Sequence, residues 1–311
     1  MKAIVLTAYG DVDKLEEREL PSPHPGPNEV VVRVAGASIN PVDWKIRSGA
    51  AKGRHAFSFP GVLGRDASGE VVEVGSDVKD LAVGDRVLGL VQGAYAELVT
   101  APAESWAKLP PGLDVVDAGA LPLVLLTGAQ LIEEAARPAR GDVVLVTGAV
   151  GSVGRVAVFA AKERGAIVWA GVRASQREEA AQLGVTGTVA LEDDADVARL
   201  PQLDAVADTV DGETIKKVLG KVKPGGVIGS VLGEPAGAKE RGLVVRAFMA
   251  HPDSKMLARY AAAVAERRLV IPIAKKLPLT AAREAQKLAE SGPGGKVLLV
   301  ADPTFSGGSS S

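Results

Sequence analysis

The sequence contains no cysteine, which excludes disulfide bonds and thiolate zinc sites. Its three histidines, His24, His55 and His251, lie far apart and lack the spacing of a metal-binding helix. We therefore expect no bound metal, although a site assembled from scattered His, Asp and Glu side chains stays open.

The chain also lacks an excess of charge, since 36 basic residues against 38 acidic ones give a net charge of -2. This balance offers no general attraction to nucleic acid or to an anionic membrane. No apolar run approaches the roughly 20 residues that span a bilayer, and Met1 to Leu6 does not resemble a signal peptide. We expect a cytoplasmic protein with neither nucleic acid nor membrane as a partner.

At 311 residues, of which 47% are hydrophobic, the chain is long enough for two globular domains. Residues 1–120 are rich in turns and short apolar runs, which favours a small barrel. The expected strands are 2–6, 29–35, 70–74, 86–90 and 94–100.

The pattern changes after Pro110, where strands and helices begin to alternate as in a doubly wound parallel sheet. We assign this second domain to 121–266. The expected strands are 143–147, 167–171, 187–190, 204–208, 225–231 and 243–248, and the helices are 117–136, 152–164, 175–183, 212–221 and 253–268. Residues 267–301, with strands at 269–273 and 296–300 and a helix at 280–291, return to the first domain, and 302–311 form a disordered tail.

Glycines recur at Gly148, Gly151 and Gly154, directly after the apolar run Val143 to Val146. A strand, a glycine turn and a helix are the parts of a dinucleotide-binding unit, in which the helix N-terminus faces the pyrophosphate. An ordinary glycine-rich turn is the alternative, because the motif by itself is weak.

The residues after the second strand indicate the cofactor. A site for NAD places a carboxylate there to accept the ribose hydroxyl, but this strand ends without a carboxylate within reach. Arg173 follows instead, with Ser175 and Arg177 beyond it, and guanidinium groups suit a 2′-phosphate. We therefore favour NADP(H); the alternative is that both arginines are solvated charges at a helix start.

With these motifs in place, the chain resembles the zinc-independent quinone oxidoreductase branch of the medium-chain dehydrogenase/reductase superfamily. The resemblance extends over about 1–301. The matching stretches are GASINPVDWKIRSG at 36–49, PGVLGRDASGEVVEVGSDVKDLAVGDRVLGL at 60–90, GAYAELV at 93–99, ALPLVLLTGAQ at 120–130, VLVTGAVGSVGRVAVFAAKERGA at 144–166 and GKVLLV at 295–300. It implies a GroES-like barrel domain, a Rossmann domain, an active-site cleft between them and often a homodimer.

Zinc-containing alcohol dehydrogenases of this superfamily carry a cysteine and a histidine-glutamate pair as catalytic ligands. By this resemblance, the corresponding stretches of this chain are Ser38 to Asn40 and Gly64 to Asp66, with Arg65 and Asp66 at the His-Glu positions. Because these ligands are missing, the resemblance implies a reaction without metal polarisation.

The resemblance also implies a set of site residues. Asn40 matches an asparagine near the nicotinamide, Thr127 a residue that faces the cofactor, and Lys45 stands beside Trp44 where several relatives have a tyrosine. The remaining cofactor positions are Val150, Gly151, Ser152 and Val153 at the pyrophosphate, Gly171 and Arg173 at the adenosine ribose, and Val210, Val231, Leu232, Phe248 and Lys296 toward the nicotinamide half.

These features predict an NADPH-dependent oxidoreductase that passes hydride to a quinone or an α,β-unsaturated carbonyl compound. A donor near the substrate oxygen would help, and Asn40, Lys45 and Thr127 are candidates beside Trp44. As alternatives, Asn40 is only a turn residue and Trp44 only core packing, while Asp43 and Asp66 are explained as turn or ion-pair carboxylates. Two other functions stay open: an enoyl-thioester reductase, or a non-catalytic NADPH-binding sensor.

Overall fold

The computed structural model describes residues 1–210 and 212–307, and the chain divides into two compact units. Of the described residues, the first unit contains 1–123 and 252–307, and the second unit contains 124–210 and 212–251. The return to the first unit therefore comes at 252, earlier than the expected 267. The helix α8 (Ser254–Ala265) causes the difference, because it packs against strand β8 of the first unit.

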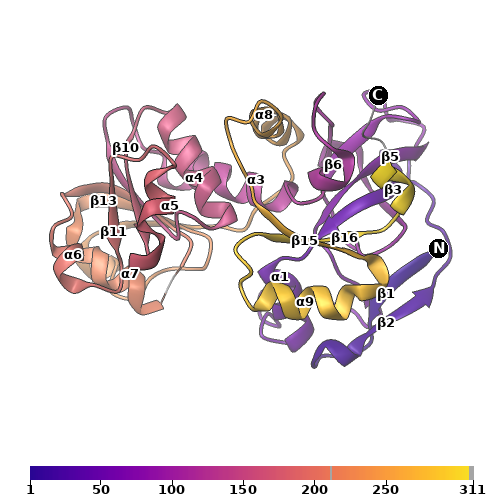
Figure 1. Ribbon diagram of the computed structural model, residues 1–311, viewed down its shortest axis with the longest axis horizontal. Coiled ribbons are helices and arrows are strands. Elements are labelled where there is room, and N and C mark those ends of the chain that lie inside the picture. Colours follow the sequence, from indigo (N-terminus) through magenta and orange to yellow (C-terminus); the bar gives the residue numbers. More distant parts are fainter. Residues whose placement is uncertain (211, 308–311) are drawn as a thin grey trace. The chain divides into compact units, whose positions relative to one another are not determined.

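Two sheets form the first unit (Figure 1). The smaller has the order β2-β1-β4, and the larger runs β15-β16-β3-β5-β6-β8, with β7 also paired to β3. The strands are β1 (Lys2–Leu6), β2 (Leu15–Glu19), β3 (Glu29–Ser38), β4 (Gly61–Val62), β5 (Asp66–Val74), β6 (Arg86–Leu90), β7 (Leu98–Pro102), β8 (Trp106–Lys108), β15 (Ile273–Pro278) and β16 (Lys296–Val300). The helices besides α8 are α1 (Pro41–Ser48), α2 (Val115–Ala118) and α9 (Ala282–Glu290).

The second unit is a six-stranded parallel sheet in the order β11-β10-β9-β12-β13-β14. This is the strand order of a dinucleotide-binding sheet, in which the direction of succession reverses beside the first strand. The strands are β9 (Val143–Thr147), β10 (Ile167–Val172), β11 (Gly187–Ala190), β12 (Leu203–Asp208), β13 (Val222–Ser230) and β14 (Val244–Ala247). The helices are α4 (Ser152–Glu163), α5 (Arg177–Ala181), α6 (Asp194–Ala198) and α7 (Gly212–Val218).

The expected long helix at 117–136 is wrong as a single element. It is divided into α2, α3 (Pro122–Gln130) and a π-helix at 131–136. Gly119 lies between α2 and α3, where a β-carbon would come within 2.5 Å of the backbone of Gly36 on β3. Only glycine fits so close to β3. Gly119 ends α2 at this point, and Pro122 begins the next helix.

The expected strand at 269–273 is also misplaced, because β15 begins only at Ile273. The apolar residues before it, Leu269 and Ile271, are buried without forming the strand, whereas β15 itself carries exposed lysines. Parallel pairing with β16 holds β15 in place. Its side chains are mostly exposed, so they give no hydrophobic periodicity by which the sequence could predict the strand.

The tail differs from the expectation as well, because residues 303–307 form a short 3-10 helix. Arg33 pairs with Asp302 at 3.4 Å, and its guanidinium lies 4.8 Å from the ring centroid of Phe305. These two contacts hold the segment against β3. The rest of the expected disordered tail, 308–311, lies outside the described residues.

Candidate active site

Six buried polar side chains form a cluster in the first unit, where the end of β3, the start of β5 and the start of β16 meet. Antiparallel pairing of β16 with β3 sets Leu298 opposite Ser38, and Ile39 N–H donates to the carbonyl of Val297 at 2.9 Å. This register brings Lys296 to the end of β3. The members of this polar cluster are Ser38, Asn40, Asp43, Asp66, Tyr95 and Lys296.

Asp66 is fully buried at the start of β5 and accepts hydrogen bonds on both oxygens. Its Oδ2 accepts from Asn40 Nδ2 at 2.8 Å and from the hydroxyl of Ser38, and its Oδ1 accepts from the backbone N–H of Leu123 at 2.5 Å. A buried carboxylate is tolerated only when it is paired in this way. Asp66 is therefore the anionic centre of the polar cluster.

Lys296 supplies the matching positive charge. Its Nζ donates to Asn40 Oδ1 at 2.6 Å and to the carbonyl of Ile39 at 3.1 Å, and it lies 3.9 Å from Asp66 Oδ2. Burial lowers the pKa of Lys296, whereas the carboxylates of Asp66 and Asp43 act in the opposite direction. The ammonium is thus held by the cluster.

Asn40 connects these two charges through its side-chain amide. Its Nδ2 faces Asp66 and the carbonyl of Ser38, the latter at 3.3 Å, while its Oδ1 accepts from Lys296. Both amide hydrogens therefore have protein acceptors. In this arrangement Asn40 positions the lysine, and its expected role as a donor to a substrate oxygen stays a prediction.

Asp43 and Tyr95 complete the cluster. Asp43 Oδ2 accepts from the backbone N–H of Asn40 at 2.7 Å and from the hydroxyl of Tyr95 at 2.8 Å. Burial raises the pKa of Asp43 to about 6. The pKa of the Tyr95 hydroxyl is also raised, first by its own burial and then by the neighbouring charge of Asp43. Asp43 Oδ1 is buried without a hydrogen-bond partner among the described residues.

Asp43 and Asp66 were expected only as turn or ion-pair carboxylates, and they do have these contacts, since Asp43 accepts from the N-cap N–H of α1 and Asp66 faces Lys296. Sequence reasoning did not name Tyr95. Asp43 had a detectable signal, because Asn40, Pro41 and Asp43 are the residues expected at the first turn of a helix. That helix is α1, and Gly49 ends it with φ of 83°. Asp66 and Tyr95 reach the cluster from β5 and from the segment before β7, so no local pattern reveals them.

Trp44 and Lys45 also lie on α1 but are not part of the polar cluster. Trp44 is partly buried and packs against the core of the first unit. Lys45 is exposed, and its amino group makes no hydrogen bond or ion pair with any described residue. Their expected roles at the substrate stay predictions.

In the second unit, the glycine turn joins β9 to α4. Gly148 has φ of 63°, which favours glycine, and a β-carbon there would come within 2.6 Å of Thr209 Oγ1. A β-carbon on Gly154 would come within 2.1 Å of the Gly148 carbonyl oxygen, but one on Gly151 would meet only that oxygen, at 3.2 Å. Gly148 and Gly154 are therefore required by packing, whereas Gly151 leaves space on the outside of the turn.

The expected pyrophosphate residues surround this open side. Ser152 and Val153 begin α4 after the N-cap Gly151, and the first N–H groups of a helix favour anions. Val150 lies just before, with its carbonyl accepting from Arg155 Nε at 3.0 Å. Gly171 at the end of β10 accepts from Ala149 N–H at 3.3 Å, which ties the second strand to the turn.

A buried carboxylate, Asp208, organises the carboxyl ends of three strands in the same unit. Its Oδ1 accepts from Thr147 Oγ1 of β9 at 2.8 Å and its Oδ2 from Ser230 Oγ of β13 at 3.3 Å. Asp208 was not singled out from the sequence, because its partners come from other strands.

Around Asp208 the structure gathers several expected cofactor residues. Val231 N–H donates to the Asp208 carbonyl at 3.3 Å, Leu232 N–H to Ser230 Oγ at 3.2 Å, and Phe248 N–H to the Ser230 carbonyl at 3.1 Å. Val210 follows β12 and is exposed. Ligands of open α/β sheets bind at this edge.

The adenosine end differs from the expectation in one respect. The statement that no carboxylate is within reach of the second strand is wrong, because Glu192 Oε1 accepts from the N–H of Ala174 at 2.7 Å. Glu192 follows the next strand, β11, which lies parallel to β10. Glu192 and Ala174 are 18 residues apart in sequence, and the pairing of β10 with β11 brings them together.

The two arginines of this region have different surroundings. Arg177 forms an ion pair with the buried Asp196. Arg173 is exposed and has no ion pair within the described part of the chain, and Ser175 is exposed beside it. Arg173 is therefore the cation that a phosphate would meet first.

Thr127 lies in α3 and is almost fully buried. Its neighbour Gly128 packs closely on α4, since a β-carbon there would come within 2.5 Å of the Val156 side chain. This close packing holds α3, which carries Thr127, against α4. The role of Thr127 toward the cofactor stays a prediction.

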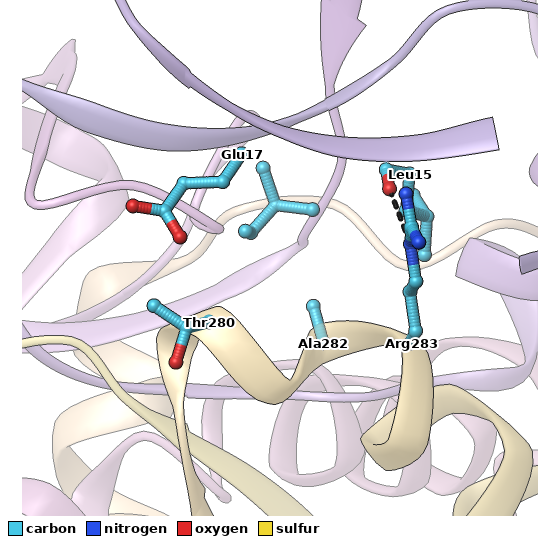
Figure 2. A pocket seen from close by; sticks show the side chains of 6 residues that line it. Leu15, Glu17, Thr280, Ala282 and Arg283 are labelled. Carbon is cyan, nitrogen blue, oxygen red and sulfur yellow. Dashed lines mark hydrogen bonds between the residues drawn. The ribbon is translucent and has the colours of Figure 1, made fainter. Parts of the chain in front are cut away.

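A cavity of about 230 Å³ in the first unit has none of these residues in its lining. Figure 2 shows its lining between β2 and the start of α9, where Arg283 Nε donates to the Leu15 carbonyl at 2.7 Å. Because this guanidinium is already bound to backbone, the cavity gives no sign of a ligand. The lining residues are Ile4, Leu15, Glu17, Thr280, Ala282 and Arg283.

Comparisons with known proteins identify the family of the chain. The model of the alcohol dehydrogenase GroES-like domain matches residues 26–111, and that of the zinc-binding dehydrogenase matches residues 183–299. The quinone oxidoreductase of Pseudomonas aeruginosa is 33% identical over 236 residues, which cover 73% of this chain and 72% of that protein.

The chain belongs to the quinone oxidoreductase branch of the medium-chain dehydrogenase/reductase superfamily. The structure of the quinone oxidoreductase from Coxiella burnetii superimposes with a TM-score of 0.87 at 30% identity, over 97% of this chain and 99% of that one. The chloroplast envelope quinone oxidoreductase homolog of Arabidopsis thaliana is 36% identical, and the match spans 59% of each chain. The chain thus spans less than two thirds of that relative.

Membership confirms the predicted fold class, a GroES-like domain with a Rossmann domain of the kind found in pyridine-nucleotide-binding dehydrogenases. Within 1–210 and 212–307, no three His, Asp or Glu side chains gather as a metal site would require. Over the same ranges, no helix has the length and apolar character needed to cross a membrane.

Proposed function

We propose that this chain reduces quinones or α,β-unsaturated carbonyl compounds with NADPH, by hydride transfer without a metal ion. The observation that carries the proposal is the buried Lys296, which the Asn40 amide holds 3.9 Å from Asp66. Asn40 is an amide and Asp66 is fully engaged by donors, so neither offers the thiolate or imidazole that zinc prefers. The lysine ammonium and the neighbouring Arg65 would also repel a divalent cation.

The second unit fits a dinucleotide. The open side of Gly151 leaves room for a pyrophosphate close to the backbone, and exposed Arg173 and Ser175 suit a 2′-phosphate. When bound, the nicotinamide supplies the hydride. The chain's part is to bind, to orient and to keep water out.

Negative charge develops on the conjugated oxygen as hydride arrives. Within the polar cluster Lys296 is the group suited to stabilise it, since a fixed cation in a site of low dielectric acts strongly and needs little reorganisation. Asn40 and Asp66 are positioning residues that hold the ammonium in place. The proton that completes the reduction comes from solvent, while Lys45, Thr127 and Trp44 keep their proposed places at the substrate.

The direct test follows the absorbance of NADPH with a benzoquinone, a short enone and an enoyl thioester as acceptors. We expect turnover with the quinone or the enone, faster than with NADH, and unchanged after dialysis against a chelator. Loss of activity on chelation would contradict the metal-free reaction. Fluorescence enhancement of bound NADPH without oxidation by any acceptor would select the non-catalytic sensor instead.

We also propose a homodimer that works in the cytoplasm. Strand β14 is at the edge of the six-stranded sheet, and Val244 on it and Met249 just after it are exposed. An edge strand with apolar side chains favours pairing with a second copy. Light scattering should give twice the chain mass, and Val244→Asp should reduce it; cell fractionation tests the compartment.

A further inference from the structure

A carboxylate stands beside the proposed 2′-phosphate position. The turn that follows β10, residues 173–176, is joined to the turn that follows β11 by the 2.7 Å hydrogen bond from Ala174 N–H to Glu192 Oε1. Since the strands are parallel neighbours, with Val172 opposite Ala190, both turns lie at the carboxyl edge of the sheet. This edge receives the adenosine ribose in dinucleotide-binding sheets.

The neighbouring acidic residues are engaged elsewhere. Asp193 caps α6 by accepting from the N–H groups of Ala195 and Asp196, and Asp194 pairs with Lys217 at 2.7 Å. Only Glu192 among these acids bonds to the turn after β10. Its position is therefore specific and does not follow from a general acidic surface.

The turn that donates a hydrogen bond to Glu192 is flanked by two arginines, Arg173 and Arg177. The hydrogen bond from Ala174, together with Arg173 and Arg177, lowers the pKa of Glu192, so the side chain is ionised at neutral pH. Arg177 is already paired with Asp196, which leaves Arg173 to interact with either Glu192 or a phosphate. The two anions would compete for one guanidinium.

We propose that Glu192 determines cofactor specificity: its carboxylate orders the 173–176 turn and limits the preference of this chain for a 2′-phosphate over a 2′-hydroxyl. The inference rests on the proposed NADPH function and refines it. In NADH the same carboxylate is available to the ribose hydroxyl, as a carboxylate at the strand end is in NAD sites. Glu192 thus allows NADH to bind and moderates the gain from the phosphate.

The exposure of the Glu192 side chain sets the size of the expected change in cofactor preference. Glu192 is exposed at the protein surface, so water and salt screen its charge. We expect removal of the charge to raise the ratio of NADPH to NADH affinity by about 3- to 10-fold at low ionic strength, and less at high salt.

The test compares Glu192→Gln with a matched control. Gln keeps an acceptor for Ala174 N–H but removes the charge, and Glu178→Gln makes the same change at an exposed site on α5 where no described residue pairs with the side chain. Dissociation constants are measured by nucleotide fluorescence for NADPH and NADH, and by competition for 2′,5′-ADP and 5′-AMP. Glu192→Gln should raise the affinity ratio, and Glu178→Gln should leave it unchanged.

A second variant separates order from charge. Glu192→Ala removes the hydrogen bond as well, so both nucleotides should bind more weakly while the ratio still rises. An unchanged or lower ratio in Glu192→Gln overturns the proposal. If wild-type protein prefers NADH but Glu192→Gln still raises the ratio, the proposed cofactor preference fails and the role of Glu192 stands.

Discussion

The ammonium of Lys296 lies 3.9 Å from the carboxylate of Asp66, and the Asn40 amide bonds to both. A buried ion pair of this kind is sensitive to loss of either partner, because the remaining charge keeps its desolvation cost. The relationship joins β5 to β16 and therefore links the two separate sequence segments that make up the first unit. Its disruption should therefore affect both folding and turnover.

The first prediction concerns this pair. Asp66→Asn and Lys296→Met should each lower the free energy of unfolding by about 3–5 kcal/mol. The double variant should lose less than the sum, because it removes both charges together. Urea unfolding of the four proteins measures the coupling, and purely additive losses would show that the pair does not interact.

The same variants bear on turnover. At a temperature where it is folded, Lys296→Met should reduce kcat by about 10- to 100-fold, since a preorganised cation is removed. Lys296→Arg keeps the charge and should recover part of the rate. Equal rates in the wild type and Lys296→Met would remove Lys296 from the proposed mechanism.

The second prediction concerns pH. Burial raises the pKa of Asp43 to about 6, so the folded chain holds this proton more tightly than the unfolded chain does. The contribution of Asp43 to stability is then present at low pH and is lost as the pH rises through the folded pKa. Asp43→Asn keeps acceptors for Asn40 N–H and the Tyr95 hydroxyl without titrating.

The measurement is the difference in unfolding free energy between wild type and Asp43→Asn. We expect the wild type to lose about 1–2 kcal/mol relative to the variant between about pH 5 and pH 7. A difference that stays constant over this range would mean that Asp43 titrates normally.

Local chemistry explains which parts the sequence predicts. The strand, glycine turn and helix at β9 and α4 are contiguous, Gly148 has a positive φ, and a β-carbon on Gly154 would meet the Gly148 carbonyl oxygen of the same turn. Hydrophobic pattern and glycine spacing therefore identify this unit. The β16 strand is likewise a continuous apolar run and was predicted with its observed bounds, 296–300.

Long-range pairing explains what was missed. Tyr95 and Asp208 are buried polar residues, and their burial depends on partners that lie far away in sequence. Glu192 reaches Ala174 only because β10 and β11 are neighbours. A search at fixed spacing from the glycines cannot find such contacts, because the sheet order decides them.

The third prediction separates the two arginines. Arg173→Ala should reduce kcat/KM with NADPH by about 10- to 100-fold while NADH is little affected, because a charge-assisted contact to the phosphate is lost. Arg177→Ala should change the ratio less, since Arg177 is committed to Asp196. Steady-state kinetics with both cofactors provide the comparison, and equal shifts in the two variants would contradict the assignment.

The last prediction uses two glycines of one turn as a matched pair. In Gly154→Ala the new β-carbon would come within 2.1 Å of the Gly148 carbonyl oxygen, so the backbone must move at a cost of about 1–3 kcal/mol or more. In Gly151→Ala the same oxygen is 3.2 Å away, a tighter contact than usual, but nothing else among the described residues lies within 4 Å, so stability should fall by less than in Gly154→Ala. The methyl group would instead occupy the space left for the pyrophosphate, and NADPH affinity should fall by about 10-fold or more. Thermal unfolding and NADPH titration of both variants distinguish the two effects. If Gly151→Ala bound NADPH as tightly as the wild type, the open side of this turn would not be the pyrophosphate site.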